Sequence, residues 1–211
     1  MNIYERIEKV GIVPVVVLDD SEDAIDLGKA LLNGGIDVAE ITFRTEAAEE
    51  SIKKMSEELP EILVGAGTVL TMEQLEKAIN AGAKFIVSPG FDENIVNKCV
   101  EENIPVFPGT VTPTDIIKAI NSGLDVVKFF PAGNYGGLKT IKSLSGPFNN
   151  IKFMPTGGVN SENLEEYLKF DKIIAVGGSW IADKKLIKEK NFKEIEKIAK
   201  EARDIFKKIR G

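Results

Sequence analysis

Residues 125–132 read DVVKFFPA, a short run of β-branched and aromatic residues that contains one lysine and ends at a proline turn. Apolar side chains at nearly every position are typical of a strand that is buried on both faces, as in a parallel sheet. Seven further runs of this kind occur along the chain. They lie at residues 12–17, 37–42, 62–66, 84–88, 105–107, 151–155 and 173–176. The sequence therefore predicts eight short, buried strands.

Stretches with the apolar spacing of amphipathic helices separate these strands. They include residues 21–33, 71–80, 92–102, 114–121 and 161–168, and a longer stretch at 184–209. Strand starts recur about every 23 residues, which is enough for one strand, one short helix and two tight turns. Strict alternation predicts a parallel α/β sheet, and eight units predict a closed (β/α)8 TIM barrel that spans residues 1–211 as a single domain. A doubly wound open sheet is the alternative.

The composition limits the kinds of protein that this chain can be. The 211 residues carry 27 Lys and Arg against 33 Asp and Glu, a net charge of −6, so no basic surplus indicates a nucleic-acid partner. No apolar run reaches the ~18–20 residues of a membrane span, and the polar residues 1–10 do not resemble a signal peptide. The only cysteine, Cys99, is expected to be buried and unreactive, and it has no second cysteine for a disulfide. These features predict a cytoplasmic protein without membrane contact.

The chain contains no histidine. This excludes Ser-His-Asp and Cys-His catalysis, and it excludes zinc sites built on histidine. With one cysteine, zinc sites built on thiolates are excluded as well. Acid–base chemistry must therefore come from Glu, Asp, Lys, Tyr or water.

Lys128 is the first candidate for chemistry, because functional groups in such barrels gather where the strands end. Alternation along the strand puts Val126, Lys128 and Phe130 on one face. An amine inside the protein loses hydration, which favours its neutral form, and a neutral amine attacks a carbonyl to form a Schiff base. The alternative is a structural lysine that extends its charge to solvent. We favour the functional interpretation, since a buried lysine is rare without a partner.

The second strand ends with VAEITFR at residues 38–44, where alternation puts Glu40, Thr42 and Arg44 on one face. A glutamate in a buried strand needs a partner or a proton. Beside a reactive lysine it can shuttle protons, and Arg44 can bind a carboxylate through its forked guanidinium group. The alternative is a structural ion pair of Glu40 with Arg44 or with Lys128.

Glycine pairs follow the last two strands, at Gly157-Gly158 and at Gly177-Gly178, and Ser179 comes next. The loops after strands seven and eight form the usual phosphate site of these barrels, where glycine amides and a helix N-terminus hold the oxygens. The pairs therefore predict a phosphate site, and the alternative is two tight turns that need positive φ angles. The strand ends GAGT at 65–68 and SPG at 88–90 are weaker candidates.

Taken in order, these strand ends resemble the 2-keto-3-deoxy-6-phosphogluconate (KDPG) and 2-keto-4-hydroxyglutarate (KHG) aldolase family of class I aldolases. The matching motifs span nearly the whole chain. They are VPV at 13–15, EITFRT at 40–45, GAGTV at 65–69, SPG at 88–90, KFFPA at 128–132, PTGG at 155–158 and GGSW at 177–180. Each motif alone is modestly specific, and the ordered set is highly specific.

The resemblance implies a role for each matched residue. Lys128 would form the Schiff base with the C2 carbonyl of the keto acid, and Glu40 would shuttle protons by way of water. Arg44 and Thr68 would hold the pyruvate carboxylate. The remaining roles are those of pocket walls, at Pro89 and Phe130, and of phosphate binding, at Gly157, Gly158, Gly178 and Ser179.

The same resemblance implies cleavage of KDPG to pyruvate and glyceraldehyde 3-phosphate in the Entner–Doudoroff pathway, by a homotrimer that needs no cofactor and no metal. Loops 108–114 and 134–135 depart from the family pattern, which leaves open the stereochemistry at C4 and activity on KHG. Two other functions also stay open. One is a sugar-phosphate epimerase or isomerase, although metal-dependent epimerases of this shape use histidine ligands. The other is a barrel that binds sugar phosphates without turnover.

Overall fold

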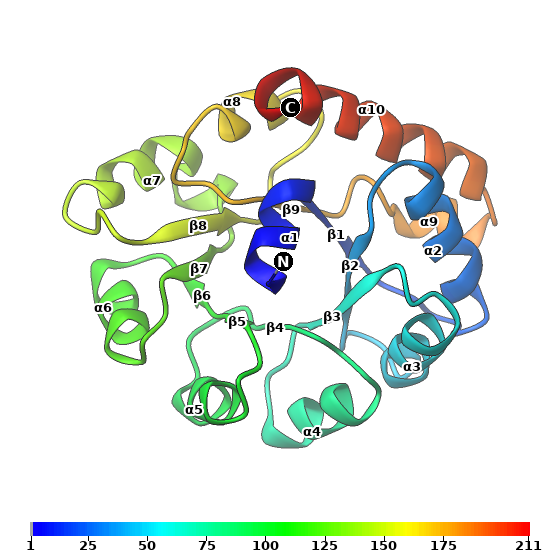
Figure 1. Cartoon of the computed structure of the whole chain (residues 1–211), viewed down its shortest axis with the longest axis horizontal. Coiled ribbons are helices and arrows are strands. Elements are labelled where there is room, and N and C mark those ends of the chain that lie inside the picture. The colour runs from blue at the N-terminus through cyan, green and yellow to red at the C-terminus, as the bar shows by residue number, and fades with distance from the viewer. Residues whose placement is uncertain (1) are drawn as a thin grey trace.

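The computed structural model describes residues 2–211, and within them the chain forms nine short parallel strands. The strands are β1 (Ile12–Val16), β2 (Val38–Thr42), β3 (Leu63–Gly67), β4 (Ile86–Val87), β5 (Val106–Phe107), β6 (Gly109–Thr110), β7 (Val126–Phe129), β8 (Lys152–Pro155) and β9 (Val176–Gly178). Figure 1 shows the strands around the centre of the molecule, with α1 across the middle and the other helices outside the strands.

The strands do not form one closed ladder of hydrogen bonds. One sheet has the order β5-β4-β3-β2-β1-β9, and a separate sheet has the order β6-β7-β8. Pro108, which has no backbone N–H, separates β5 from β6. Within residues 2–211, the β8 and β9 regions share only isolated bridges, at Phe153–Ile173 and Thr156–Gly177. The predicted closed eight-stranded TIM barrel is therefore wrong: the structure has an open six-stranded half-barrel and a separate three-stranded sheet.

The predicted alternation of strands and helices is confirmed by the element order. The helices are α1 (Ile3–Val10), α2 (Asp23–Asn33), α3 (Ala48–Glu58), α4 (Met72–Asn80), α5 (Glu93–Glu101), α6 (Pro113–Asn121), α7 (Gly137–Ser145), α8 (Leu164–Leu168), α9 (Lys184–Lys188) and α10 (Phe192–Arg210), with a 3-10 turn, η1, at Gly133–Tyr135. The predicted stretch 184–209 divides into α9 and α10. Asn191 lies between them, and its side chain caps α10.

Helix α1 covers the amino ends of the strands. Its Tyr4 ring meets the Phe107 ring edge-on at 5.4 Å, and its Glu8 pairs with Lys152 at the start of β8 at 2.8 Å. Figure 1 shows α1 across the centre of the molecule. The carboxyl ends of these parallel strands therefore lie at the opposite end of the molecule from α1. A separate finding is that no helix in residues 2–211 is long and apolar enough to span a membrane.

Candidate active site

Lys128 and Glu40 meet inside the molecule, although they lie on strands far apart in the sequence. Lys128 is on β7 and Glu40 is on β2, and the two residues are 2% and 0% exposed. Nζ of Lys128 is 3.7 Å from Oε1 of Glu40 and 4.8 Å from the centre of the Phe130 ring. The lysine therefore does not extend to solvent, and a proton-accepting group lies beside its amine.

Both carboxylate oxygens of Glu40 are buried without a hydrogen-bond partner among the described residues. A Cβ on Gly67 would overlap the Glu40 side chain, whose Cγ would be 2.6 Å away, so the carboxylate occupies space that a glycine leaves free. A buried carboxylate without hydrogen bonds is costly, and it is well suited to bind a polar group of a substrate. Gly65 has another purpose, because its missing side chain makes room for the Phe85 ring of the core.

Arg44 and Thr68 come together at the carboxyl ends of β2 and β3. Nε of the exposed Arg44 donates a hydrogen bond to Oγ1 of Thr68 at 3.2 Å. Thr68 adopts a φ of 55°, in the left-handed region that a threonine rarely occupies. No ion pair between Arg44 and Glu40 is found among residues 2–211, so of the two structural pairs considered for Glu40 only the one with Lys128 forms. A strained residue that accepts a bond from an exposed arginine is typical of a binding site.

Phe130 and Pro89 share the wall of a cavity of about 280 Å³. The cavity lies beyond the carboxyl ends of β4, β6 and β7, and Thr110 and Tyr135 line it as well. Phe130 therefore has the Lys128 amine on one side and this cavity on another. The predicted pocket residues thus lie together, next to the buried lysine.

The glycine pair after β8 forms a tight turn beside Phe130. Gly157 and Gly158 adopt φ angles of 87° and 80°, as the alternative of a tight turn requires. A Cβ on Gly157 would lie 3.5 Å from the Phe130 ring, and one on Gly158 would lie 3.1 Å from Cα of Gly133. The turn therefore brings backbone without side chains close to Phe130. This geometry is compatible both with a phosphate site and with a purely structural tight turn.

The glycine pair after β9 has a different cause. Both Gly177 and Gly178 lie in β9, and a Cβ on Gly178 would overlap the ring of Trp180. Ser179 is exposed, and none of its side-chain hydrogen bonds is found among residues 2–211. The loop thus presents the Ser179 hydroxyl to solvent, directly after a glycine against which the Trp180 ring packs.

Thr156 is a further candidate for the site, to which the sequence analysis gave no role. It is buried between the two glycine loops, bridged to Gly177, and its Oγ1 has no hydrogen-bond partner among the described residues. Its backbone N–H donates to the carbonyl of Phe129, next to Lys128, at 2.9 Å. The available signal was a threonine in an apolar strand end, directly before the Gly157-Gly158 pair.

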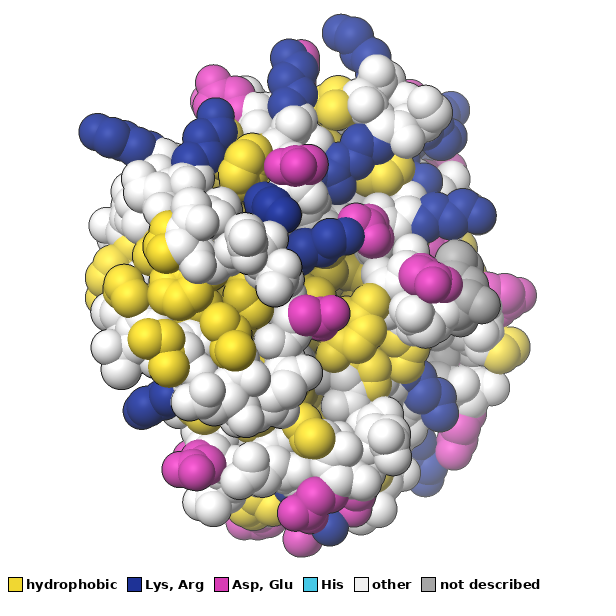
Figure 2. All heavy atoms as spheres, turned by 60° about the vertical axis from the view of Figure 1, so that its left-hand side comes forward, with side chains coloured by type: hydrophobic (Ala, Val, Ile, Leu, Met, Phe, Trp, Pro, Cys, Tyr) yellow, Lys and Arg dark blue, Asp and Glu magenta, His cyan; other side chains and the backbone are white. Residues whose placement is uncertain are grey.

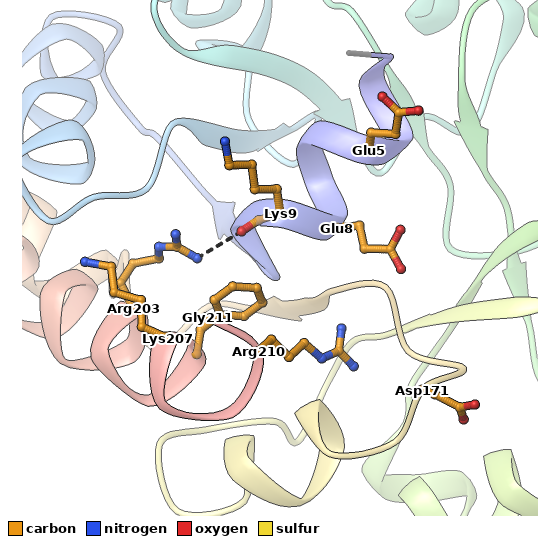
Figure 3. Close-up of a pocket in the computed structure, with 9 residues that line it drawn as sticks. Glu5, Glu8, Lys9, Asp171, Arg203, Lys207, Arg210 and Gly211 are labelled. Carbon is orange, nitrogen blue, oxygen red and sulfur yellow. Dashed lines mark hydrogen bonds between the residues drawn. The ribbon is translucent and has the colours of Figure 1, made fainter.

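A cavity of about 690 Å³ lies at the other end of the molecule, by α1 and the end of α10 (Figure 3). Two arginines that line it already bond to backbone carbonyls of the protein. Nη1 of Arg203 donates to carbonyls of Lys9 and Val10, and Arg210 donates to carbonyls of Leu168 and Phe170 at 2.7 and 3.0 Å. This cavity is larger than the one beside Phe130, and both arginines hold backbone segments together, although Nε of Arg203 is buried without a hydrogen-bond partner among residues 2–211.

The described residues also show the placement of the acidic groups and of the single thiol. Among residues 2–211, no three Asp, Glu or Cys side chains gather closely enough to hold a metal ion. Cys99 is buried, as predicted, and burial raises the pKa of its thiol to about 12, with a smaller contribution from Glu102. The thiol is therefore un-ionised at neutral pH and a poor nucleophile.

Comparison with known proteins agrees with this geometry. Residues 3–198 match the sequence profile of the KDPG and KHG aldolase family. A 2-dehydro-3-deoxy-phosphogluconate aldolase of Haemophilus influenzae is 44% identical over 98% of this chain and 97% of its own. A KDPG aldolase structure from Legionella pneumophila, with pyruvate captured as a covalent carbinolamine, has a TM-score of 0.91 at 36% identity and covers 95% of this chain and 97% of its own. A KDPG aldolase structure from Zymomonas mobilis with 3-phosphoglycerate has a TM-score of 0.89 at 38% identity, covering 97% of each chain. This chain is therefore a member of the KDPG and KHG aldolase family.

Proposed function

We propose that this protein is a class I aldolase that cleaves 2-keto-3-deoxy-6-phosphogluconate to pyruvate and glyceraldehyde 3-phosphate. The observation that carries the proposal is the buried amine of Lys128, 3.7 Å from a Glu40 carboxylate that has no hydrogen-bond partner among the described residues. The names of the relatives and the pyruvate carbinolamine of the Legionella enzyme support the same activity. We expect the whole chain to act as one domain, in the cytoplasm.

The chemistry begins at the Lys128 amine. Its lone pair attacks C2 of the keto acid, and loss of water from the carbinolamine gives a protonated Schiff base. The C4 hydroxyl then gives up its proton as the C3–C4 bond breaks, and the bonding electrons move toward the iminium nitrogen to form an enamine. Glyceraldehyde 3-phosphate leaves, C3 of the enamine takes up a proton, and water releases pyruvate from Lys128.

Glu40 is the proton carrier in this scheme. Its carboxylate accepts a proton, by way of water, when the C4 hydroxyl is deprotonated, and returns one when C3 of the enamine is protonated. Its oxygens lack other partners among the described residues, so these transfers break no existing hydrogen bond of the carboxylate. The overall reaction leaves Glu40 in the protonation state in which it started.

Substrate binding is divided between the two sides of Lys128. The pyruvate carboxylate is held by Arg44, with Thr68 beside it, and Pro89 and Phe130 form the walls. The distal phosphate lies against the amides of Gly157 and Gly158 and the hydroxyl of Ser179. Gly178 lies beside it, with its own N–H in the β1–β9 ladder.

The decisive experiment is trapping of the Schiff base. Incubation with pyruvate and borohydride reduces the imine to a stable secondary amine, and intact mass with peptide mapping locates it. We expect one pyruvyl group, on Lys128, that is absent without pyruvate. Lys152→Ala is the matched control, because Lys152 is also a strand lysine paired with a glutamate, but at the amino end. The Lys152→Ala variant should be labelled to the same extent as the natural protein.

A protein that binds sugar phosphates without turnover is the second candidate. It is favoured by the ion-pair distance between Lys128 and Glu40, which a purely structural pair would also show. Such a protein would bind KDPG in calorimetry but give no adduct with pyruvate and no pyruvate from KDPG. Adduct formation at Lys128 would contradict it.

We also propose that the protein assembles as a homotrimer. Figure 2, with the left-hand side of Figure 1 turned forward, shows hydrophobic side chains gathered on this surface. Large apolar side chains exposed in this part of the chain include Ile117 and Ile120 on α6 and Tyr135 in η1, at 49%, 43% and 52%. Sedimentation equilibrium should give three chains per particle, and Ile117→Lys with Ile120→Lys should give monomers if this patch is the interface.

A further inference from the structure

Trp180 follows the proposed phosphate loop of β9 and packs back onto it. A Cβ on Gly178 would overlap the six-membered part of the indole, with Cη2 at 2.6 Å, so the ring occupies the side-chain space of residue 178. Gly178 is itself fixed in the sheet, opposite Pro14 of β1. The chain bends at the exposed Ser179, between a strand residue and the ring that lies on it.

Packing, and not hydrogen bonding, holds the indole in this position. The half-buried Trp180 packs against the hydrophobic core. Its Nε1 is out of contact with solvent and has no hydrogen-bond partner among residues 2–211. A rigid ring wedged between the core and a glycine restrains the backbone that it touches.

The proposed phosphate site depends on backbone placement to an unusual degree. None of its four residues is charged. Gly157 and Gly158 offer N–H groups and Ser179 adds a hydroxyl, whereas the N–H of Gly178 belongs to the β1–β9 ladder and Gly178 serves as the fixed residue before Ser179. A lysine or arginine side chain can follow a displaced phosphate, but a peptide N–H points wherever the backbone holds it. Phosphate affinity therefore depends on how firmly the two loops are fixed.

We propose that Trp180 is a positioning residue for the phosphate of the substrate, because its ring on Gly178 fixes the backbone that leads into Ser179 and with it the direction of the Ser179 hydroxyl. This inference rests on the proposed function. A purely structural tryptophan would affect all substrates alike when it is replaced. A positioning tryptophan affects only substrates that carry the phosphate.

The test compares two substrates in two variants, Trp180→Leu and Trp180→Phe. We expect Trp180→Leu to raise KM for KDPG about tenfold, the loss of one hydrogen bond to a charged group, with kcat within about twofold. The kcat/KM for unphosphorylated 2-keto-3-deoxygluconate should be unchanged, and Trp180→Phe should restore most of the affinity. Equal losses on both substrates, or no loss on either, would overturn the proposal.

Phe206→Leu is a matched control for general loosening. The Phe206 ring occupies the side-chain space of Gly11 in the same manner, but at the amino end of the strands. This variant should lower Tm and leave the ratio of the two KM values unchanged. A change in that ratio as large as that of Trp180→Leu would also overturn the proposal.

The protein's single tryptophan provides a second readout that needs no variant. Titration of the natural protein with inorganic phosphate should change the indole emission in a saturable manner, and Ser179→Ala should weaken the apparent affinity. The proposal would be overturned if the indole emission stayed unchanged up to phosphate concentrations at which competitive inhibition of KDPG cleavage by phosphate is saturated. Borohydride trapping separates the two levels of inference: no pyruvate adduct in the natural protein refutes the proposed function, whereas an adduct with unaltered phosphate dependence in Trp180→Leu refutes only the role of Trp180.

Discussion

The two ends of the strands differ in how far their buried polar groups are hydrogen-bonded. At the amino end, Arg210 donates to carbonyls of Leu168 and Phe170, and Glu8 pairs with Lys152. At the carboxyl end, both oxygens of Glu40 and Oγ1 of Thr156 are buried without a hydrogen-bond partner among the described residues, and Glu40 has an ion pair with Lys128 at 3.7 Å. At the amino end Nε of Arg203 also lacks a hydrogen-bond partner among these residues, but Nη1 of the same group donates to carbonyls of Lys9 and Val10. The amino end thus leaves one atom of a bonded side chain unpaired, whereas the carboxyl end leaves a whole carboxylate without a hydrogen bond.

The difference shows where to look for function in this molecule. An unpaired buried polar group costs about 1–3 kcal/mol, so a fold keeps such groups where another demand outweighs their cost. Cavity volume alone leads elsewhere, because the cavity of about 690 Å³ lies at the amino end. The smaller cavity is lined by Phe130, whose ring centre is 4.8 Å from Nζ of Lys128, the ion-pair partner of Glu40.

The largest effect should come from the nucleophile. We expect Lys128→Ala to lower kcat for KDPG cleavage by at least about 10⁴-fold, because among the described residues Lys128 is the only buried lysine. Circular dichroism should show an intact fold. Near-normal turnover in a folded Lys128→Ala protein would mean that the carboxyl end is not the catalytic end.

Glu40→Gln should have the next largest effect. The amide has the same shape but cannot carry the proton, so we expect kcat to fall by about 10²- to 10⁴-fold in steady-state assays. Glu8→Gln makes the same change at the amino end. There we expect unchanged kcat and a loss of unfolding free energy of less than about 1 kcal/mol, since the Glu8–Lys152 pair is half exposed. Equal effects of the two variants would remove the distinction between the ends.

The site was predictable where a charged residue occurs within an apolar run of the sequence. A lysine and a glutamate inside apolar runs pointed to burial, and alternation gave the faces of Lys128 and Glu40. The glycines were harder, because a sequence shows that a side chain is missing but not which neighbour takes its place. Gly65 receives Phe85 and Gly178 receives Trp180, and both neighbours are set by tertiary packing.

The fold was predictable to a similar degree. The repeat of strand and helix follows from local apolar patterns, which survive in the structure as buried strands. Closure of the sheet does not follow from them, because it depends on hydrogen bonds between particular strands. Pro108 divides one expected strand into β5 and β6, and the β8–β9 junction keeps only isolated bridges, so the count and the closure were both wrong.

Thr156→Val should separate stability from function. The valine removes a buried hydroxyl that has no partner among the described residues, so we expect the free energy of unfolding to rise by about 1 kcal/mol. If the hydroxyl binds substrate, KM for KDPG should rise about tenfold in the same protein. Chemical denaturation and steady-state kinetics measure the two quantities. A variant that loses stability would show that Thr156 is an ordinary structural residue.

Arg210→Met should give the mirror image at the amino end. The substitution leaves the carbonyls of Leu168 and Phe170 without their donor, and we expect a loss of about 2 kcal/mol in unfolding free energy. The kcat and KM for KDPG should stay as they are in the natural protein. A shift in KM would show that the two ends are coupled.

Gly67 has a consequence for anyone who re-engineers this protein. The Glu40 carboxylate can occupy its position only because residue 67 has no side chain, since any Cβ there would overlap the carboxylate. Residue 67 contributes no functional group, so a search that ranks positions by their chemistry passes over it. A mutant library that randomises residue 67 should nevertheless return glycine alone among its active members. A description of this active site should therefore include Gly67, the residue whose lack of a side chain gives the Glu40 carboxylate its space.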